Sequence, residues 1–138
     1  LVQRFGVEPK VALLSHSNFG TSNAPSARKM RRASELLRER HPQLQLDGEM
    51  HVLSALNPAL RATVYPDANL QGRANVLVMP NLDAANIAMG LIRSMTDALL
   101  IGPFIHGLAK PAHIVIPSVS ARGIFNMTAA TVADLKQS

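Results

Sequence analysis

Hydroxyl, amide and imidazole side chains are concentrated in one short segment near the start of the sequence. It reads Ser15-His16-Ser17-Asn18-Phe19-Gly20-Thr21-Ser22-Asn23. The Gly-x-Ser-x-Gly turn of many serine hydrolases is absent, and adjacency of His16 to serines in the sequence does not supply the geometry of a catalytic triad. A polar loop that leads into a helix is suited to binding an anion. We therefore favour an anion-binding loop over a catalytic triad.

A second group of ionisable residues is Asp47-Gly48-Glu49-Met50-His51. Alternate residues of a strand share a face, so Asp47, Glu49 and His51 could together ligate a metal ion. No His-Glu-x-x-His or comparable ligand spacing supports that role, and the chain has no cysteine. We interpret the two acids as solvated residues of a strand-end turn and predict no metal site. The isolated histidines His41, His106 and His113 are interpreted as structural.

Short apolar runs predict the strands that must position these groups. The clearest are Val11–Leu14 and residues 73–79, the second of which ends at Pro80. Residues 43–50 indicate a further strand that closes in the acidic turn, and residues 113–116 a last one. Glycine-rich phosphate motifs, both Gly-x-Gly-x-x-Gly and the P-loop, are absent.

Amphipathic segments predict helices over residues 26–40, 53–64, 84–97 and from 118 or 120 to about 135. Ser26 is expected to cap the first helix, and Asn57-Pro58 to start a new turn within the second. Residues 81–83 are expected to cap the third helix. Its apolar side chains are expected to face inward: Ile87, Leu91, Ile92 and Met95.

Alternation of apolar strands with amphipathic helices predicts an α/β fold, a three-layer α/β/α architecture with a largely parallel sheet. Ligands of such folds bind at the carboxyl ends of the strands. Two loops are expected there, residues 15–23 and residues 80–86, and both precede helix N-termini that favour anions such as phosphate.

Most of the net charge of +5 lies in one predicted helix. Residues 26–40 contain six basic and two acidic residues, a net +4. A solvated amphipathic helix explains this charge, and a cationic rim for a phosphorylated small molecule or an acidic partner is the functional alternative. Nucleic acid is disfavoured because the chain has one Tyr, four Phe and no recognisable binding motif.

Composition excludes several further classes of protein. With 138 residues, 47% of them hydrophobic, the chain can bury a core. The longest aliphatic stretch, Ala98–Ala109, has 12 residues, well short of the roughly 20 that a membrane span needs. No cationic-then-apolar leader is present, and we expect a cytoplasmic protein. Leu1, Val2 and Phe5 are spaced as on a helix that ends at Gly6, so we interpret the chain as a piece of a longer protein.

Several strings, taken in order, resemble the C-terminal part of the phosphate acetyl/butyryl transferase family. They are residues 11–20 (VALLSHSNFG), 47–50 (DGEM), 72–87 (GRANVLVMPNLDAANI), Gly102-Pro103 and 107–111 (GLAKP). The resemblance implies a two-lobed phosphotransacetylase-like fold, of which this chain is a fragment, usually dimeric, that binds coenzyme A thioesters between its lobes. Residues 1–112 would form part of the inserted lobe, and residues 113–138 a strand and helix returning to the first lobe.

The sequence departs from active members of that family after Ala109-Lys110-Pro111. Active members continue with Ser-Arg-Gly and an acid, which hold the thiol, bind the anionic substrate and act as base. Counted without gaps, Ile116, Pro117 and Gly123 occupy the positions of the Ser, the Arg and the acid. The resemblance therefore implies that this chain has no catalytic residues.

This loss, together with His113-Ile114 and residues 124–128 (IFNMT), is similar to the domain at the C-terminus of hybrid NADP-dependent malic enzymes. That similarity implies acetyl-CoA as an allosteric effector of malate oxidation to pyruvate. NADP and a divalent metal are implied only for a malic-enzyme region outside this chain. The alternatives are an active phosphate acetyl- or butyryltransferase, acting between an acyl phosphate and coenzyme A, and a purely structural dimerisation module.

The expected partners are an acyl-CoA and further copies of the chain in a homo-oligomer, with neither nucleic acid nor a membrane. The expected ligand contacts are Ser15, Ser17, Asn18, Thr21 and Ser22 in the first loop, Asn81, Asp83 and Asn86 in the second, and Lys110 as a phosphate partner.

Overall fold

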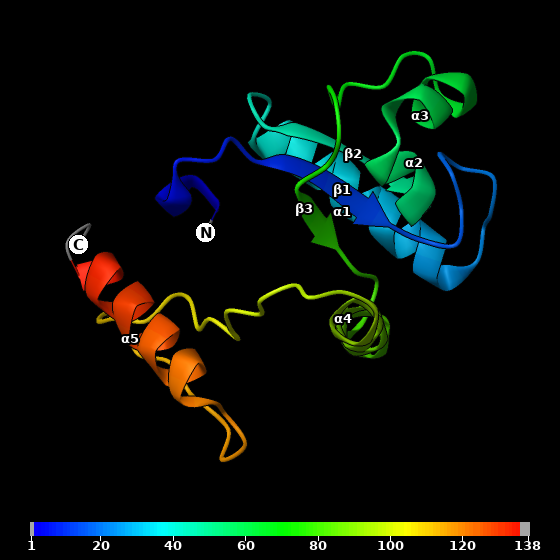
Figure 1. Cartoon of the computed structure of the whole chain (residues 1–138). Helices are drawn as coiled ribbons and strands as arrows, with labels where there is room; N and C mark the ends of the chain where they lie inside the picture. Colours follow the sequence, from blue (N-terminus) through cyan, green and yellow to red (C-terminus); the bar gives the residue numbers. More distant parts are fainter. Residues whose placement is uncertain (1, 136–138) are drawn as a thin grey trace. The chain divides into compact units, whose positions relative to one another are not determined.

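A computed structural model describes residues 2–135 of the chain. Three parallel strands form its sheet: β1 (Lys10–Leu14), β2 (Gln45–Met50) and β3 (Val76–Val78), in the order β2-β1-β3 (Figure 1). The chain divides into two compact units, Leu1–Ala88 and Met89–Ser138, which are described separately. The predicted division at residue 112 stays a prediction.

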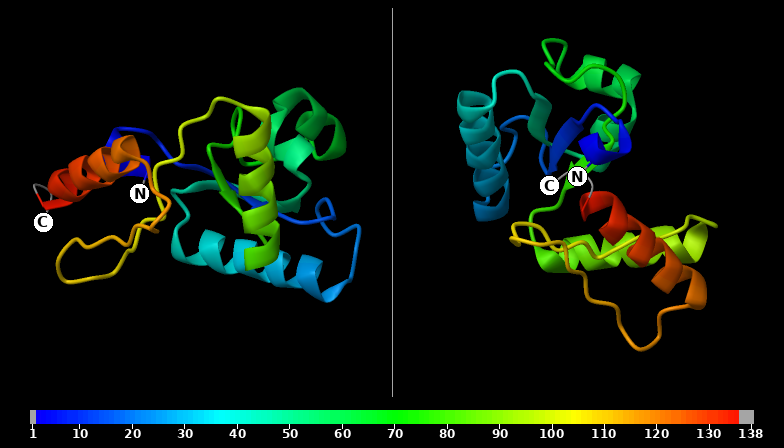
Figure 2. Two further views of the ribbon diagram at one scale, coloured as in Figure 1. Left: turned by 60° about the horizontal axis from the view of Figure 1, so that its bottom comes forward. Right: turned by 90° about the vertical axis from the view of Figure 1, so that its left-hand side faces the viewer.

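Helices lie on both faces of this sheet, so the predicted α/β fold with a parallel sheet is confirmed. Helix α1 (Pro25–Arg40) covers one face, and α2 (Val52–Leu56) covers the other (Figure 2). Helix α3 (Pro58–Val64) follows α2 after a break at Asn57, whose side chain accepts a hydrogen bond from the amide of Leu60 at 3.1 Å. The new turn expected at Asn57-Pro58 is thus confirmed.

The start of α1 differs from the prediction. Helix α1 begins at Pro25, its N-cap is Ala24, and no side chain caps it, so the prediction of a Ser26 cap was wrong. Proline is favoured at the first helical position because its ring presets φ and its missing N–H would have no partner there. The prediction considered only a side-chain cap and not a proline as the first residue of the helix.

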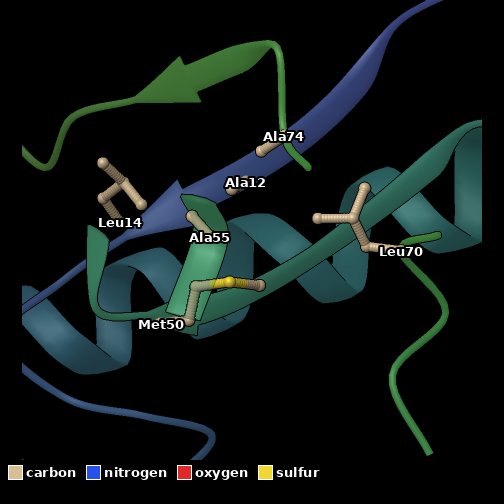
Figure 3. Packing of buried hydrophobic residues seen from close by; sticks show 6 residues of the cluster. All are labelled: Ala12, Leu14, Met50, Ala55, Leu70 and Ala74. Atoms are coloured by element: carbon tan, nitrogen blue, oxygen red, sulfur yellow. The ribbon is translucent and has the colours of Figure 1, made fainter. Parts of the chain in front are cut away.

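Two apolar clusters lie on opposite faces of the sheet. Ala12, Leu14 and Met50 pack with residues of α2 and of the segment before β3 (Figure 3). Val11, Leu13 and Leu46 pack instead with Met30 of α1. β1 thus alternates strictly, as expected for a strand buried on both faces.

The chain near Gly6 forms the short 3-10 helix η1 (Val2–Phe5). Gly6 follows it with φ of 70° and donates its amide to the carbonyl oxygen of Gln3 at 3.0 Å, which confirms the expected stop. Leu1, the first residue of the predicted pattern, lies outside the described residues.

Helix α4 (Leu82–Met95) begins and ends two residues earlier than the predicted range of 84–97, and its apolar residues do not face inward. Ile87 and Met95 are 64% and 79% exposed, and Leu91 and Ile92 are also exposed. The prediction of their burial was wrong. An amphipathic pattern specifies which side of a helix is apolar, but burial also requires a neighbour to cover that side.

In the second unit, helix α5 (Ala121–Leu135) follows a segment without regular structure from 97 to 120. The helix expected from residue 118 or 120 thus starts directly after Ser120, whose hydroxyl accepts a hydrogen bond from the amide of Gly123 at 3.1 Å and caps α5. Residues 113–116, predicted as a strand, form none here. Ile105 donates its amide to Nδ1 of buried His113 at 3.2 Å. From residue 2 to residue 135, no helix is long and apolar enough to cross a membrane.

Candidate functional site

Two polar loops leave the sheet at one edge. β1 pairs in parallel with β3, so the loops that follow them, residues 15–23 and residues 80–86, begin at neighbouring carboxyl ends. This is the arrangement predicted from the alternation of strands and helices, and it is the edge where α/β folds bind ligands.

The hydroxyl groups of the first loop, residues 15–23, make hydrogen bonds within the loop. The Ser17 hydroxyl is buried, lies 3.1 Å from that of Thr21, and accepts a hydrogen bond from the amide of Ser22 at 3.1 Å. The Thr21 hydroxyl also accepts from the amide of Asn18 at 3.2 Å. The Ser15 hydroxyl accepts from the amide of Ser17 at 3.2 Å. Much of the acceptor capacity of these predicted ligand contacts is therefore used within the loop.

Asn18 joins the loop to the start of α2. Its Oδ1 accepts hydrogen bonds from the amide of His51 at 2.8 Å and from the hydroxyl of Ser54 at 3.2 Å. His51 in turn donates Nε2–H to the carbonyl oxygen of His16 at 2.7 Å. Within residues 2–135 no hydrogen bond engages Nδ2 of Asn18, which remains available as a donor.

The acids of β2 are buried ion-pair partners rather than solvated turn residues. Asp47 and Glu49 lie within β2, fully buried, and each pairs with an arginine of α1. Our interpretation of a solvated strand-end turn was therefore wrong. The sequence placed the two acids in a turn at the end of the strand because charged residues are usually solvated. A buried charged residue cannot be distinguished from a solvated one in the sequence until its partner is located. In the described part of the chain no three His, Cys, Asp or Glu side chains are grouped to hold a metal ion.

Glu49 is the most densely bonded side chain of the site. Its Oε1 accepts hydrogen bonds from the Ser17 hydroxyl at 3.0 Å and the Gly20 amide at 2.9 Å. Arg31 donates Nε–H to Oε2 at 3.0 Å and an Nη2 hydrogen to Oε1 at 2.9 Å. Burial by itself would raise the pKa of Glu49, but the hydrogen bonds from Arg31, Gly20 and Ser17 outweigh it, so this pKa is lowered. Glu49 is thus held as a carboxylate.

The second loop contributes fewer bonded groups. Asn81 Oδ1 accepts a hydrogen bond from the amide of Ala84 at 2.9 Å and caps α4, as predicted. Asp83 and Asn86 are exposed on the first turns of α4. Because the carboxylate of Asp83 already lies near the N-terminus of α4, an anion is less favoured there than at the first loop.

Lys29 is a site residue that the sequence did not single out. This exposed residue of α1 donates from Nζ to the carbonyl oxygen of Pro80, which places an ammonium group beside the start of the second loop. In the sequence Lys29 is one of six cations in the same helix, and no local pattern distinguishes it from the others. Only its contact with Pro80 in the folded chain reveals its position.

The remaining predicted residues belong to the second unit, where Lys110 is exposed. Ile116 and Pro117 are exposed as well, and Gly123 lies in the first turn of α5. None of the last three carries an ionisable side chain. Their assignment to catalytic positions, and the ligand contacts proposed above, stay predictions.

The fold and the polar edge define an α/β protein with a polar loop at the carboxyl end of a strand in a parallel sheet. The profile of the Phosphate acetyl/butaryl transferase family matches residues 1–132, and the chain belongs to this family. The phosphotransacetylase from Streptococcus pyogenes superposes with a TM-score of 0.89 at 35% identity, over 99% of this chain and 42% of that one. The resemblance inferred from the sequence strings is confirmed.

Two malic enzymes are more similar to this chain in sequence than the Streptococcus pyogenes phosphotransacetylase is. The NAD-dependent malic enzyme of Rhizobium meliloti (strain 1021) is 53% identical over 133 residues, 96% of this chain and 17% of its own length. The NADP-dependent malic enzyme of Escherichia coli (strain K12) is 53% identical over 134 residues, 96% of this chain and 18% of its own length. The chain thus spans less than one fifth of the length of these relatives.

Proposed function

We propose that the chain is a phosphotransacetylase-like regulatory domain of a malic enzyme and binds acetyl-CoA as an allosteric effector. The observation that carries this proposal is the 53% identity to malic enzymes across 96% of the chain. In this proposal, malate is oxidatively decarboxylated to pyruvate in a region outside the chain, which would also hold NADP and a divalent metal. The domain would assemble as a homo-oligomer.

The chemistry of the first loop supports an anionic ligand. Its hydroxyl oxygens largely serve as acceptors inside the loop, and Oδ1 of Asn18 accepts from His51 and Ser54. Nδ2 of Asn18 and the ammonium of Lys29 remain donors at the same edge. Acetyl-CoA carries several phosphate groups, which are matched by donors and cations. The first loop is therefore the part of the proposed site where we expect those phosphates.

Loss of acyl transfer is the second part of the proposal. Transfer between an acyl phosphate and a thiol needs a base for the thiol and a cation for the phosphate. Ile116, Pro117 and Gly123, aligned with these positions by the resemblance, supply neither. Binding can survive without catalysis because affinity and transition-state stabilisation depend on partly different contacts.

The direct test titrates acetyl-CoA against malate oxidation by the full-length protein. A change in rate that saturates with acetyl-CoA, matched by a calorimetric dissociation constant, is the expected result. Unchanged malate oxidation and no binding heat at millimolar acetyl-CoA would overturn the regulatory role.

An active phosphate acetyltransferase is the second candidate, favoured by the superposition on the Streptococcus pyogenes phosphotransacetylase. It predicts acetyl-CoA formation from acetyl phosphate and coenzyme A, which a thiol-release assay measures. Turnover at enzymatic rates would replace our proposal, whereas undetectable turnover removes this candidate. A dimer in sedimentation velocity, together with no acetyl-CoA binding, would instead favour a module that only dimerises.

A further inference from the structure

Two arginine–carboxylate pairs join α1 to β2, and they differ in what else they contact. Arg38 lies 2.5 Å from Asp47, whose second oxygen accepts the amide of Leu70 at 2.7 Å. Arg31 lies 2.9 Å from Glu49. Both carboxylates are buried, and both arginines come from the same helix. The two pairs therefore serve the same connection between α1 and β2.

Only the Arg31–Glu49 pair also contacts the 15–23 loop. Glu49 accepts hydrogen bonds from the Ser17 hydroxyl and the Gly20 amide. Arg31 donates a hydrogen bond to the carbonyl oxygen of Ser22 at 2.8 Å. The backbone of β2 adds a fourth contact, because the carbonyl oxygen of Glu49 accepts the amide of Phe19 at 2.7 Å. The pair thus fixes the loop along most of its length.

The loop benefits from such fixing because one of its residues, Phe19, has a backbone conformation that is unfavourable for a residue other than glycine. Phe19 has φ of 45° and Gly20 has φ of 93°, so two consecutive residues occupy left-handed conformations. An unfixed segment of this length would have to be ordered when a ligand binds, and that ordering lowers affinity. A loop already fixed in its binding shape avoids this loss.

We propose that Arg31 and Glu49 are positioning residues that preset the 15–23 loop for its anionic ligand without contacting the ligand themselves. This inference rests on the proposed function. It implies that losing the pair weakens ligand binding by more than the accompanying loss of fold stability explains.

The Arg38–Asp47 pair provides a matched control. Arg31→Gln and Arg38→Gln each remove one guanidinium from α1 and leave one buried carboxylate of β2 without its ion-pair partner. Both variants of the full-length protein are expected to lose stability in urea denaturation. Two further measurements then distinguish the two variants: the dissociation constant of acetyl-CoA from calorimetry, and the hydrogen-exchange rates of the amides of residues 15–23.

For Arg31→Gln we expect a dissociation constant raised by about tenfold and exchange of the Gly20 and Ser22 amides accelerated on the order of tenfold. Arg38→Gln should leave both nearly unchanged. Arg31→Lys keeps the charge but cannot bond Glu49 and Ser22 together as the guanidinium does, so it should fall between wild type and Arg31→Gln. It also provides a measurable variant where Arg31→Gln fails to fold.

Equal effects of the Arg31 and Arg38 substitutions, in proportion to lost stability, would overturn the proposal and leave the pair merely structural. Absence of acetyl-CoA binding by the wild-type protein would instead contradict the proposed function. In that case the exchange rates of the loop amides still decide whether the Arg31–Glu49 pair orders the loop.

Discussion

Leu46 and Met50 lie four residues apart on β2 but pack on opposite faces of the sheet. Leu46 joins the cluster beneath α1, and Met50 the cluster beneath α2. An even spacing would normally keep both on one face. The pairing register with β1 shifts between Leu13 and Leu14, which pair with Gly48 and Met50, so that Glu49 is an extra residue in β2. This irregularity reverses the faces and turns Glu49 toward the 15–23 loop.

Gly48 is the residue that permits this irregularity, and replacing it should be costly. Its φ is 145°, and a Cβ would lie 2.6 Å from the carbonyl oxygen of Leu13. We expect Gly48→Ala to lower the free energy of unfolding by about 3 kcal/mol or more, because backbone strain and a clash with an immobile strand combine. Urea denaturation of the full-length protein measures this change.

Gly72→Ala is the control for that substitution. Gly72 also has a positive φ, 71°, but a Cβ there would meet only the flexible end of Lys10 at 3.5 Å. It should therefore cost only about 1 kcal/mol. Equal losses from the two substitutions would show that close approach to Leu13 contributes nothing.

The elements of the fold could be predicted from the sequence because their signals are local. The apolar run at residues 11–14 and the Asn81 cap of α4 each depend on a few consecutive residues. The exposure of Ile87 was not predictable in the same way, because it depends on what covers α4. The same limit explains the error at Asp47 and Glu49, since their arginine partners are 9 and 18 residues away in the sequence.

The position of the polar loop in the candidate site was predicted from the sequence, but the hydrogen bonds of its individual atoms were not. Hydroxyl and amide side chains followed by a helix indicate a polar loop, and the loop does lie at the carboxyl end of β1. Whether Ser17 faces a ligand or Glu49 depends on the register shift within β2, which no pattern in the sequence records. Lys29 became recognisable only through its contact with Pro80.

Arg61 predicts a large loss of stability on substitution. It is 3% exposed and donates to the carbonyl oxygens of Ser54 at 3.0 Å, Ala55 at 3.4 Å, Leu70 at 2.8 Å and Gly72 at 2.5 Å. Arg61→Met would fill much of the volume but leave these acceptors without the guanidinium. We expect a loss of about 3 kcal/mol in the free energy of unfolding, measured by urea denaturation.

Arg28→Met tests whether that loss reflects the buried contacts rather than the lost charge. Arg28 is exposed on α1, and its side chain makes no hydrogen bond or ion pair within the described residues. Its substitution should change stability by less than about 0.5 kcal/mol. A loss as large as that of Arg61→Met would contradict our account.

Glu49 predicts how stability depends on pH. Its folded pKa is lowered from the ordinary value of 4.5. The unfolded chain therefore takes up the proton more readily than the folded one, and the stabilising contribution is fully present above 4.5 and lost as pH falls through the folded pKa. Glu49→Gln lacks this contribution. The stability difference between wild type and Glu49→Gln should be largest near neutral pH and narrow below 4.5.

Urea denaturation at a series of acidic pH values checks this narrowing. Glu39→Gln is the matched control, since Glu39 is exposed on α1 and lies 4.0 Å from Arg32. Its difference from wild type should stay small at every pH. A Glu49→Gln difference that is constant with pH would contradict the lowered pKa.

Lys29 predicts a loss of ligand affinity without loss of stability. Its ammonium lies beside Pro80 at the edge proposed for the phosphates of acetyl-CoA, and it is exposed. Lys29→Met should raise the dissociation constant of acetyl-CoA about threefold to fivefold, since an exposed ion pair is worth roughly 1 kcal/mol or less. High salt should shrink the difference in dissociation constant between wild type and Lys29→Met because it screens exposed charges.

Arg40→Met is the control: it removes a charge about 16 Å away along the same helix and should leave the affinity for acetyl-CoA unchanged. Equal losses in the two variants would mean that only the overall charge of α1 attracts the ligand.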